Sequence, residues 1–176
     1  VRLLSWDNAE AIDEAFYRRR LQRAIDGRAA LAADPSTTAY RLVHAESDGL
    51  PGLIVERYGD WLVLQSLTLG IERVKPLLVT LLAELCKPQG IVERSDVDVR
   101  DKEGLKPVTG LLDGSLPDPG VVEVLEQDRD GFCNAWIVRW QVRQQAFGRF
   151  LVQLETIFVD AESGAEAREH RKASCE

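Results

Sequence analysis

Histidine, cysteine and methionine are scarce in this chain of 176 residues, which has two histidines, three cysteines and no methionine. Cys86, Cys133 and Cys175 are odd in number and far apart, without the paired spacing of a zinc site or a disulfide framework. His44 and His170 would each have to meet distant partners to form a triad or a metal site. We therefore expect buried or incidental thiols, no metal and no histidine-based catalysis.

Long apolar runs and an excess of basic charge are also missing. No apolar run approaches the roughly 18 residues that span a bilayer, and no secretory signal opens the chain, so we expect a cytoplasmic protein without a membrane partner. The chain has 22 Lys and Arg residues against 29 Asp and Glu residues, a net charge of −7. This balance argues against nucleic-acid binding through the electrostatic field of the whole chain, but binding through a local basic patch remains open.

Three motifs that carry common chemistries are absent as well. The sequence has no Walker-type loop, no G-x-G-x-x-G after a strand and no G-x-S-x-G. The usual backbone cradles for phosphates and dinucleotides are therefore missing. The chain begins at Val1 and lacks methionine throughout, so we expect it to be a fragment whose parent carries the missing chemistry elsewhere.

What is present is typical of a packed globular domain. The composition is 45% hydrophobic and 29% charged, and the length suits one domain with appendages. Residues 7–28 are predicted to form a helix, capped by Asp7 or Asn8 and acidic in its first turns. Its apolar stripe comprises Ile12, Phe16, Tyr17, Leu21, Ala24 and Ile25.

The chain then changes to the period of β-strands. Residues 42–44, 53–58 and 61–65 predict three strands, and Gly59-Asp60 predicts a type II′ hairpin turn between the last two. A helix is predicted over 71–85, followed by strands at 91–94 and 108–112. Because strands and helix are segregated, the predicted fold class is α+β, a small strands-helix-strands (EEHEE-like) domain with an N-terminal helix.

The C-terminal region gives no equally clear pattern. A short strand is predicted at 121–125, residues 136–158 are rich in aromatic, Arg, Gln and Val residues without one clean period, and residues 161–176 are polar and expected to fray. This tail could bind another protein or a second copy of the chain through its large aromatic side chains, which are Trp136, Trp140, Phe147 and Phe150.

A cluster of arginines on the first helix is the candidate RNA-binding surface. It consists of Arg18, Arg19, Arg20 and Arg23. Guanidinium groups pair with phosphates, but Asp13, Glu14 and Asp26 could take the same side chains in i,i+4 ion pairs. RNA contact and a solvated helix surface both remain open.

Two loops are candidates for docking another domain or a substrate. The first is a turn whose glycines and proline define its shape, with candidate residues Ser47, Asp48, Gly49, Pro51 and Gly52. The second includes Arg94 and Asp96, in a stretch that alternates charge with small apolar residues. A plain turn and a local ion pair are the competing interpretations.

Residues 41–60, which read RLVHAESDGLPGLIVERYGD, closely resemble the central domain of bacterial S-adenosylmethionine-dependent large-subunit ribosomal RNA (cytosine-5) methyltransferases. The resemblance continues through residues 62–65, 93–100 and 103–105. Upstream, residues 5–7 and 11–20 look like the segment that enters this domain. Similarity to the family therefore covers roughly residues 1–125.

The resemblance implies three regions: residues 1–36 as the end of a PUA-type RNA-binding region with a linking helix, 37–127 as the EEHEE-like accessory domain, and 128–176 as a divergent tail. In the intact family, a following Rossmann-like domain transfers a methyl group from S-adenosylmethionine to a ribosomal cytosine, with a cysteine thiolate adding to the base. The Asp-Pro-Pro and Ser-Cys-Ser motifs of that domain are missing here. We therefore assign no catalytic residue and expect no cofactor in this chain, with ribosomal RNA binding weak or lost.

After Gln127 the sequence departs from the family pattern, which is compatible with divergence, fusion or a frameshift. The leading hypothesis is an accessory module that positions RNA or spaces the two functional domains of a methyltransferase. The alternative is a non-enzymatic interaction domain that has lost its catalytic partner. An independent small enzyme has no constellation of residues behind it.

Overall fold

The computed structural model describes the chain except residues 1, 119, 128–132, 146–148, 160–165 and 170–176. For residues 126–127, 133–137, 139–145, 149–159 and 166–169 it describes the backbone alone. The elements in chain order are α1 (Glu14–Asp26), α2 (Ala29–Ala33), β1 (Ala39–His44), η1 (Ala45–Asp48), β2 (Leu53–Tyr58), β3 (Trp61–Ser66), α3 (Leu69–Cys86), β4 (Gly90–Ser95), η2 (Asp98–Glu103), β5 (Val108–Gly114), β6 (Val121–Gln127), β7 (Cys133–Gln145), β8 (Arg149–Val159) and β9 (Glu166–Glu169).

The first sheet has five strands in the order β1-β2-β3-β4-β5. Strands β1, β2 and β3 are antiparallel neighbours, β4 runs parallel to β3, and β5 returns antiparallel to β4. Helix α3 connects the two parallel strands, as a parallel pair requires a crossover. The predicted α+β class and the order of three strands, one helix and two strands are confirmed.

The predicted hairpin between β2 and β3 is present. Tyr58 pairs with Trp61 across the turn, Gly59 has a φ of +56°, and Asp60 has no positive φ. A positive φ at the first turn position alone is the pattern of a type II′ turn, which glycine adopts without steric strain.

The first helix starts later than predicted. Its N-cap is Asp13, whose Oδ1 accepts a hydrogen bond from the Phe16 N–H at 3.0 Å, so the expected caps at Asp7 or Asn8 were wrong. The Asp7 carboxylate instead accepts from the Ala9 N–H and closes a local turn, a competing use of an Asp side chain. Ile12 therefore lies outside the helix and is 42% exposed.

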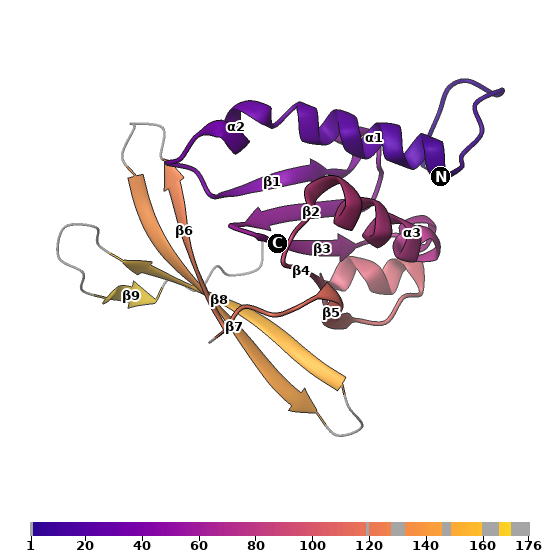
Figure 1. Ribbon diagram of the computed structural model, residues 1–176. Coiled ribbons are helices and arrows are strands. Elements are labelled where there is room, and N and C mark those ends of the chain that lie inside the picture. Colours follow the sequence, from indigo (N-terminus) through magenta and orange to yellow (C-terminus); the bar gives the residue numbers. More distant parts are fainter. Residues whose placement is uncertain (1, 119, 128–132, 146–148, 160–165, 170–176) are drawn as a thin grey trace.

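The main core lies between the helices and one face of the first sheet. Figure 1 shows α1 along β1, with α3 on the same side of the sheet. The core joins the predicted α1 residues Phe16, Tyr17, Leu21 and Ala24 to apolar residues of α3 and the sheet, such as Leu78 and Leu64. Ile25 of the predicted stripe packs against this core while partly buried.

The other face of the first sheet meets a second, four-stranded sheet of order β6-β7-β8-β9. A small cluster of buried valines joins the two: Val63 and Val92 from the first sheet, and Val122, Val124 and Val138 from the second. Strand β6, predicted at 121–125, thus pairs with β7 and not with β5.

The C-terminal region contains strands that the sequence did not indicate. Strands β7 and β8 pair in antiparallel register from Ala135↔Val159 to Gln145↔Arg149. Within the range expected to fray, residues 166–169 form β9. Phe147 lies outside the described residues, and only the backbone is described at Trp136, Trp140 and Phe150. Within the described ranges, none of the helices combines the length and hydropathy of a membrane span.

Candidate functional site

Two of the candidate RNA-binding arginines are held by acidic side chains. Arg18 Nη2 lies 3.0 Å from Glu14 Oε1 and 2.8 Å from Glu84 Oε2, which belongs to α3. Arg19 Nη2 lies 2.8 Å from Glu10 Oε1. The i,i+4 pair with Glu14 was one of the two interpretations of this cluster. All of these pairs are solvent-accessible, so each adds little to stability and could exchange for a phosphate.

The other two arginines differ from each other. Arg20 lies over the Phe16 ring, with its guanidinium carbon 5.0 Å from the ring centroid, and a Cβ on Gly49 would lie 2.8 Å from its Nη1, so its head group lies beside the turn. Arg23 is exposed and has no ion pair among the described residues. The cluster therefore contains one unengaged cation and three that would have to leave an intramolecular contact to bind RNA.

The predicted docking turn is tied to Arg28, which lies between α1 and α2. Arg28 donates to both carboxylate oxygens of Asp48 at 2.6 and 2.9 Å, and the His44 N–H donates to Oδ2 of Asp48 at 2.6 Å. Burial by itself raises the pKa of Asp48, but these hydrogen bonds outweigh it and lower that pKa overall. Ser47 is exposed, and Gly49 ends η1 in the left-handed region with a φ of +69°. Asp48 thus holds the shape of the turn.

The second half of the turn packs against the start of α3. Pro51 and Gly52 are buried, and a Cβ on Gly52 would lie 2.5 Å from Thr68 Oγ1. Thr68 caps α3 by accepting from the Ile71 N–H at 3.4 Å, and its hydroxyl donates to the Pro51 carbonyl oxygen. The absence of a side chain at position 52 is what allows this approach.

The second candidate loop follows the end of β4. Arg94 Nε and Asp96 Oδ1 lie 3.6 Å apart and both side chains are well exposed, so a local ion pair is present, and docking by this loop stays a prediction. Neither Arg94 nor Asp96 lines the cavity that Pro51 of the turn reaches.

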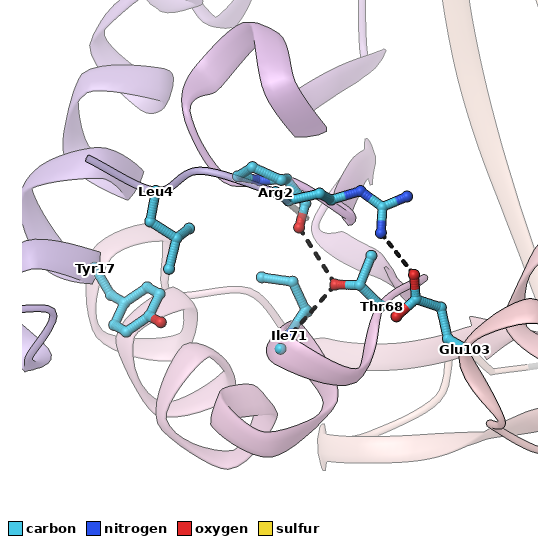
Figure 2. Close-up of a pocket in the computed structure, with 8 residues that line it drawn as sticks. Arg2, Leu4, Tyr17, Thr68, Ile71 and Glu103 are labelled. Atoms are coloured by element: carbon cyan, nitrogen blue, oxygen red, sulfur yellow. Dashed lines mark hydrogen bonds and ion pairs between the residues drawn. The ribbon is translucent and has the colours of Figure 1, made fainter. Parts of the chain in front are cut away.

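A cavity of ≈280 Å³ lies where the N-terminal segment, α1, the turn and the start of α3 meet. It is lined by Arg2, Leu4, Tyr17, Pro51, Thr68, Gly70, Ile71 and Glu103. Figure 2 shows the Tyr17 ring beneath Leu4, with its hydroxyl directed toward Ile71. On the other side, Arg2 and Glu103 form an ion pair at 2.8 Å. Of the predicted site residues, only Pro51 reaches this cavity.

The polar groups that line the cavity differ in whether they have a hydrogen-bond partner. Glu103 Oε2 accepts from the Leu69 N–H at 3.3 Å, and Thr68 is hydrogen-bonded on both sides. The Tyr17 side chain is 5% exposed, and its hydroxyl has no hydrogen-bond partner among the described residues. Burial raises the pKa of this hydroxyl, so it is a neutral donor at physiological pH.

A network of buried charges that the sequence did not predict lies beside α3. Glu93, 2% exposed, accepts from Lys75 Nζ at 2.9 Å on both carboxylate oxygens. Arg100, also 2% exposed, donates to Glu72 at 3.0 Å and to the Ser66 carbonyl oxygen.

Glu72 joins the two halves of this network, because it also accepts from Lys75 at 2.6 Å and from Ser66 Oγ at 2.7 Å. Burial alone would raise the pKa of Glu72, yet the hydrogen bonds from Lys75, Ser66 and Arg100 lower it from 4.5 to about 2. One signal in the sequence could have indicated this network: Glu93 is a carboxylate on the same face of β4 as Ile91 and Ser95, which are both buried.

The described residues offer no evident metal or nucleophile site. No group of three or more His, Cys, Asp or Glu side chains among them could hold a metal ion. Cys86 is half-buried, and burial raises the pKa of its thiol, which disfavours the reactive thiolate. The Cys133 side chain and all of Cys175 lie outside what the structure describes.

The fold is shared with methyltransferase structures. A proposed SAM-dependent methyltransferase from Streptococcus mutans superposes with a TM-score of 0.63 at 21% identity, covering 78% of this chain and 32% of that one. The structure of SMU.776, a proposed methyltransferase complexed with SAH, gives a TM-score of 0.61 at 20% identity over 75% of this chain and 31% of that one. The arrangement described above is therefore one that occurs within larger methyltransferase chains.

Sequence comparison identifies closer relatives. "Ribosomal RNA large subunit methyltransferase I" of Shewanella amazonensis is 52% identical over 117 residues, which are 66% of this chain and 30% of the relative. The protein of the same name from Aliivibrio fischeri strain MJ11 is 49% identical over 122 residues, 69% of this chain and 31% of its own. No protein-family model matches. The matched part of this chain is thus related to the large-subunit ribosomal RNA methyltransferases, and the chain spans about 30% of their length.

Proposed function

We propose that this chain supplies the accessory, non-catalytic part of a ribosomal RNA methyltransferase, with residues 37–127 as the accessory unit. The observation that carries this proposal is close identity over a small share of the relatives, 52% over 30% of the Shewanella amazonensis protein. In such a protein the unit would space the flanking domains and present RNA to the catalytic domain. The intact protein would transfer a methyl group from S-adenosylmethionine to a ribosomal cytosine.

The ties between the turn and its surroundings support a rigid spacer. The Arg28–Asp48 pair anchors the turn to the residue that caps α2, and the hydrogen bond from Thr68 to the Pro51 carbonyl oxygen anchors it to the start of α3. Arg2 of the N-terminal segment reaches both Glu46 near the turn and Glu103 of η2. A preceding domain attached through the N-terminal segment would therefore be held at several points.

The cavity at the start of α3 is small for S-adenosylmethionine. The cavity of ≈280 Å³ falls below the range of about 300–1,000 Å³ that is usual for sites of drug-sized ligands. No step of the methyl transfer is assigned to this chain for that reason.

The purified chain is expected not to bind S-adenosylmethionine. Equilibrium dialysis with the labelled cofactor measures this, and a full-length ribosomal RNA large subunit methyltransferase I serves as the positive control. No saturable binding by this chain, with binding by the control, agrees with a non-catalytic part. Saturable binding to this chain would overturn the proposal.

The arginines of α1 are proposed to contact RNA backbone phosphates. Replacing Arg18, Arg19 and Arg20 together by Ala should weaken binding of a ribosomal RNA fragment and reduce the slope of log K against log salt by about 2. Fluorescence anisotropy at several salt concentrations measures both quantities. Arg73→Ala is a matched control, since Arg73 is exposed on α3 without an ion pair among the described residues. If the triple variant and the wild type had identical salt slopes, the proposal that this helix contacts RNA would be contradicted.

A non-enzymatic interaction domain remains the second candidate. Three large apolar side chains of the N-terminal region are exposed, with Trp6 at 94%, Leu3 at 52% and Ile12 at 42%. Exposed aromatic and aliphatic groups of this kind favour contact with another protein surface. Self-association through the tail is part of this proposal, and sedimentation over a range of concentrations tests it.

A further inference from the structure

The Tyr17 hydroxyl is a buried polar group without a hydrogen-bond partner in the part of the chain that the structure describes. The side chain is 5% exposed, and Figure 2 shows the hydroxyl turned toward Ile71 in the cavity. Buried hydroxyls are normally hydrogen-bonded, since an unpaired one loses its water without compensation. A hydroxyl left in this state beside an open cavity is suited to bond with a ligand.

A second unused donor lies at the start of α3. The first N–H groups of a helix have no partner within it. Glu103, Thr68 Oγ1 and the Thr68 carbonyl oxygen serve the N–H groups of Leu69, Ile71 and Glu72, whereas the Gly70 N–H has no partner among the described residues. A Cβ placed on Gly70 would meet no atom within 4 Å, so the space beside it is open.

The local charges disfavour an anion as the ligand. The guanidinium of Arg2 is shared by two carboxylates, Glu103 at 2.8 Å and Glu46 at 3.5 Å. Together with the partial positive charge of the helix start, these groups leave no net positive charge for a phosphate or carboxylate. The cavity offers donors at Tyr17 and Gly70, an acceptor at Glu103, and apolar walls at Leu4 and Ile71.

Neutral, partly apolar groups that carry both donors and acceptors match this lining, and nucleobases are such groups. Single-stranded RNA is read by splaying out bases and hydrogen-bonding their edges in pockets of protein side chains. We propose that the cavity at the start of α3 binds one unstacked nucleobase of RNA, an inference that rests on the proposed function as an RNA-presenting unit. Phosphates outside the cavity would remain available to the arginines of α1.

Binding is tested with the full chain, a short fluorescein-labelled single-stranded oligoribonucleotide of mixed sequence, and the four free ribonucleosides. Tyr17→Phe removes the hydroxyl and keeps the ring, and Gly70→Leu fills the open space from a helical position. Tyr40→Phe removes a tyrosine hydroxyl outside the cavity and is the matched control. Thermal unfolding of each variant verifies that the fold is retained.

We expect saturable binding of the oligonucleotide and of at least one nucleoside to the wild type. Tyr17→Phe should weaken both by about threefold to tenfold, the loss of one hydrogen bond, and Gly70→Leu by about tenfold or more. Tyr40→Phe should bind like the wild type. Affinity that is unchanged in both cavity variants, or no binding of either probe to the wild type, would overturn the inference.

The remaining outcomes separate this inference from the proposed function. If the chain bound nucleosides but not the oligonucleotide, the cavity would be a site for a free metabolite, and the proposal that it binds a base of RNA would be overturned. Weaker RNA binding in the arginine variants alone would leave the proposed function standing and remove the base site. Binding of S-adenosylmethionine would instead remove the proposed function, whatever the cavity variants show.

Discussion

Replacing Lys75 by Met is expected to lower the free energy of unfolding by about 3–5 kcal/mol, because it leaves the buried Glu93 carboxylate without its partner. Lys75 Nζ donates to both oxygens of Glu93, which is 2% exposed and has no other hydrogen-bond partner among the described residues. Methionine keeps the length of the side chain, so the loss of unfolding free energy comes from the missing charge and not from a cavity.

Urea denaturation followed by circular dichroism measures this change. Lys102→Met is the control, because Lys102 is exposed on η2 without an ion pair among the described residues, and surface changes of this kind stay within about 0.5 kcal/mol. The double change of Lys75 and Glu93 to Met should recover much of the loss, since it also removes the stranded carboxylate. If Lys75→Met proved as stable as Lys102→Met, the buried pair would contribute nothing to the fold.

Gly52→Ala is expected to cost about 2–4 kcal/mol of unfolding free energy. Gly52 has a φ of +87°, and an added Cβ would lie 2.5 Å from Thr68 Oγ1 and 2.9 Å from Thr68 Cβ. The turn or the start of α3 would have to move, which should also close or distort the cavity that Thr68 lines. The cost therefore combines a strained backbone with overpacking.

Gly104→Ala separates these two contributions. Gly104 has a similar φ of +72°, but a Cβ there would meet nothing within 4 Å. This variant should lose only the preference for the left-handed region, about 1–2 kcal/mol. Thermal and urea unfolding of both variants give the difference. Equal losses would show that the contact between the turn and Thr68 is not tight.

Much of the first sheet could be predicted from local patterns. Short β-branched runs predicted β2, β3 and β4 to within a residue or two, and Gly59-Asp60 predicted the hairpin, because strand period and turn conformation depend on neighbouring residues. The α1 cap was missed because Asp7, Asn8 and Asp13 are all acceptable caps by type. Only the competing turn at Asp7 decides among them.

The candidate site was predictable in part. Position 18 follows Glu14 by one helical turn, so that ion pair was visible, whereas the pair with Glu84 joins two helices 66 residues apart. Residues 47–52 were identified as a shaped turn, but its anchors Arg28 and Thr68 come from other elements. Tyr17 was assigned to the core stripe, and nothing local indicated that its hydroxyl would face a cavity.

The sequence by itself determined the elements of the first sheet, the hairpin turn and the relationship to ribosomal RNA methyltransferases, because these depend on residue type and short spacing. Tertiary structure alone decided that Glu93 and Arg100 are buried, that β6 pairs with β7, and that a cavity opens at the start of α3. A charged residue looks the same in a sequence whether water or a partner surrounds it. The partner is supplied by distant segments, and only packing brings these together.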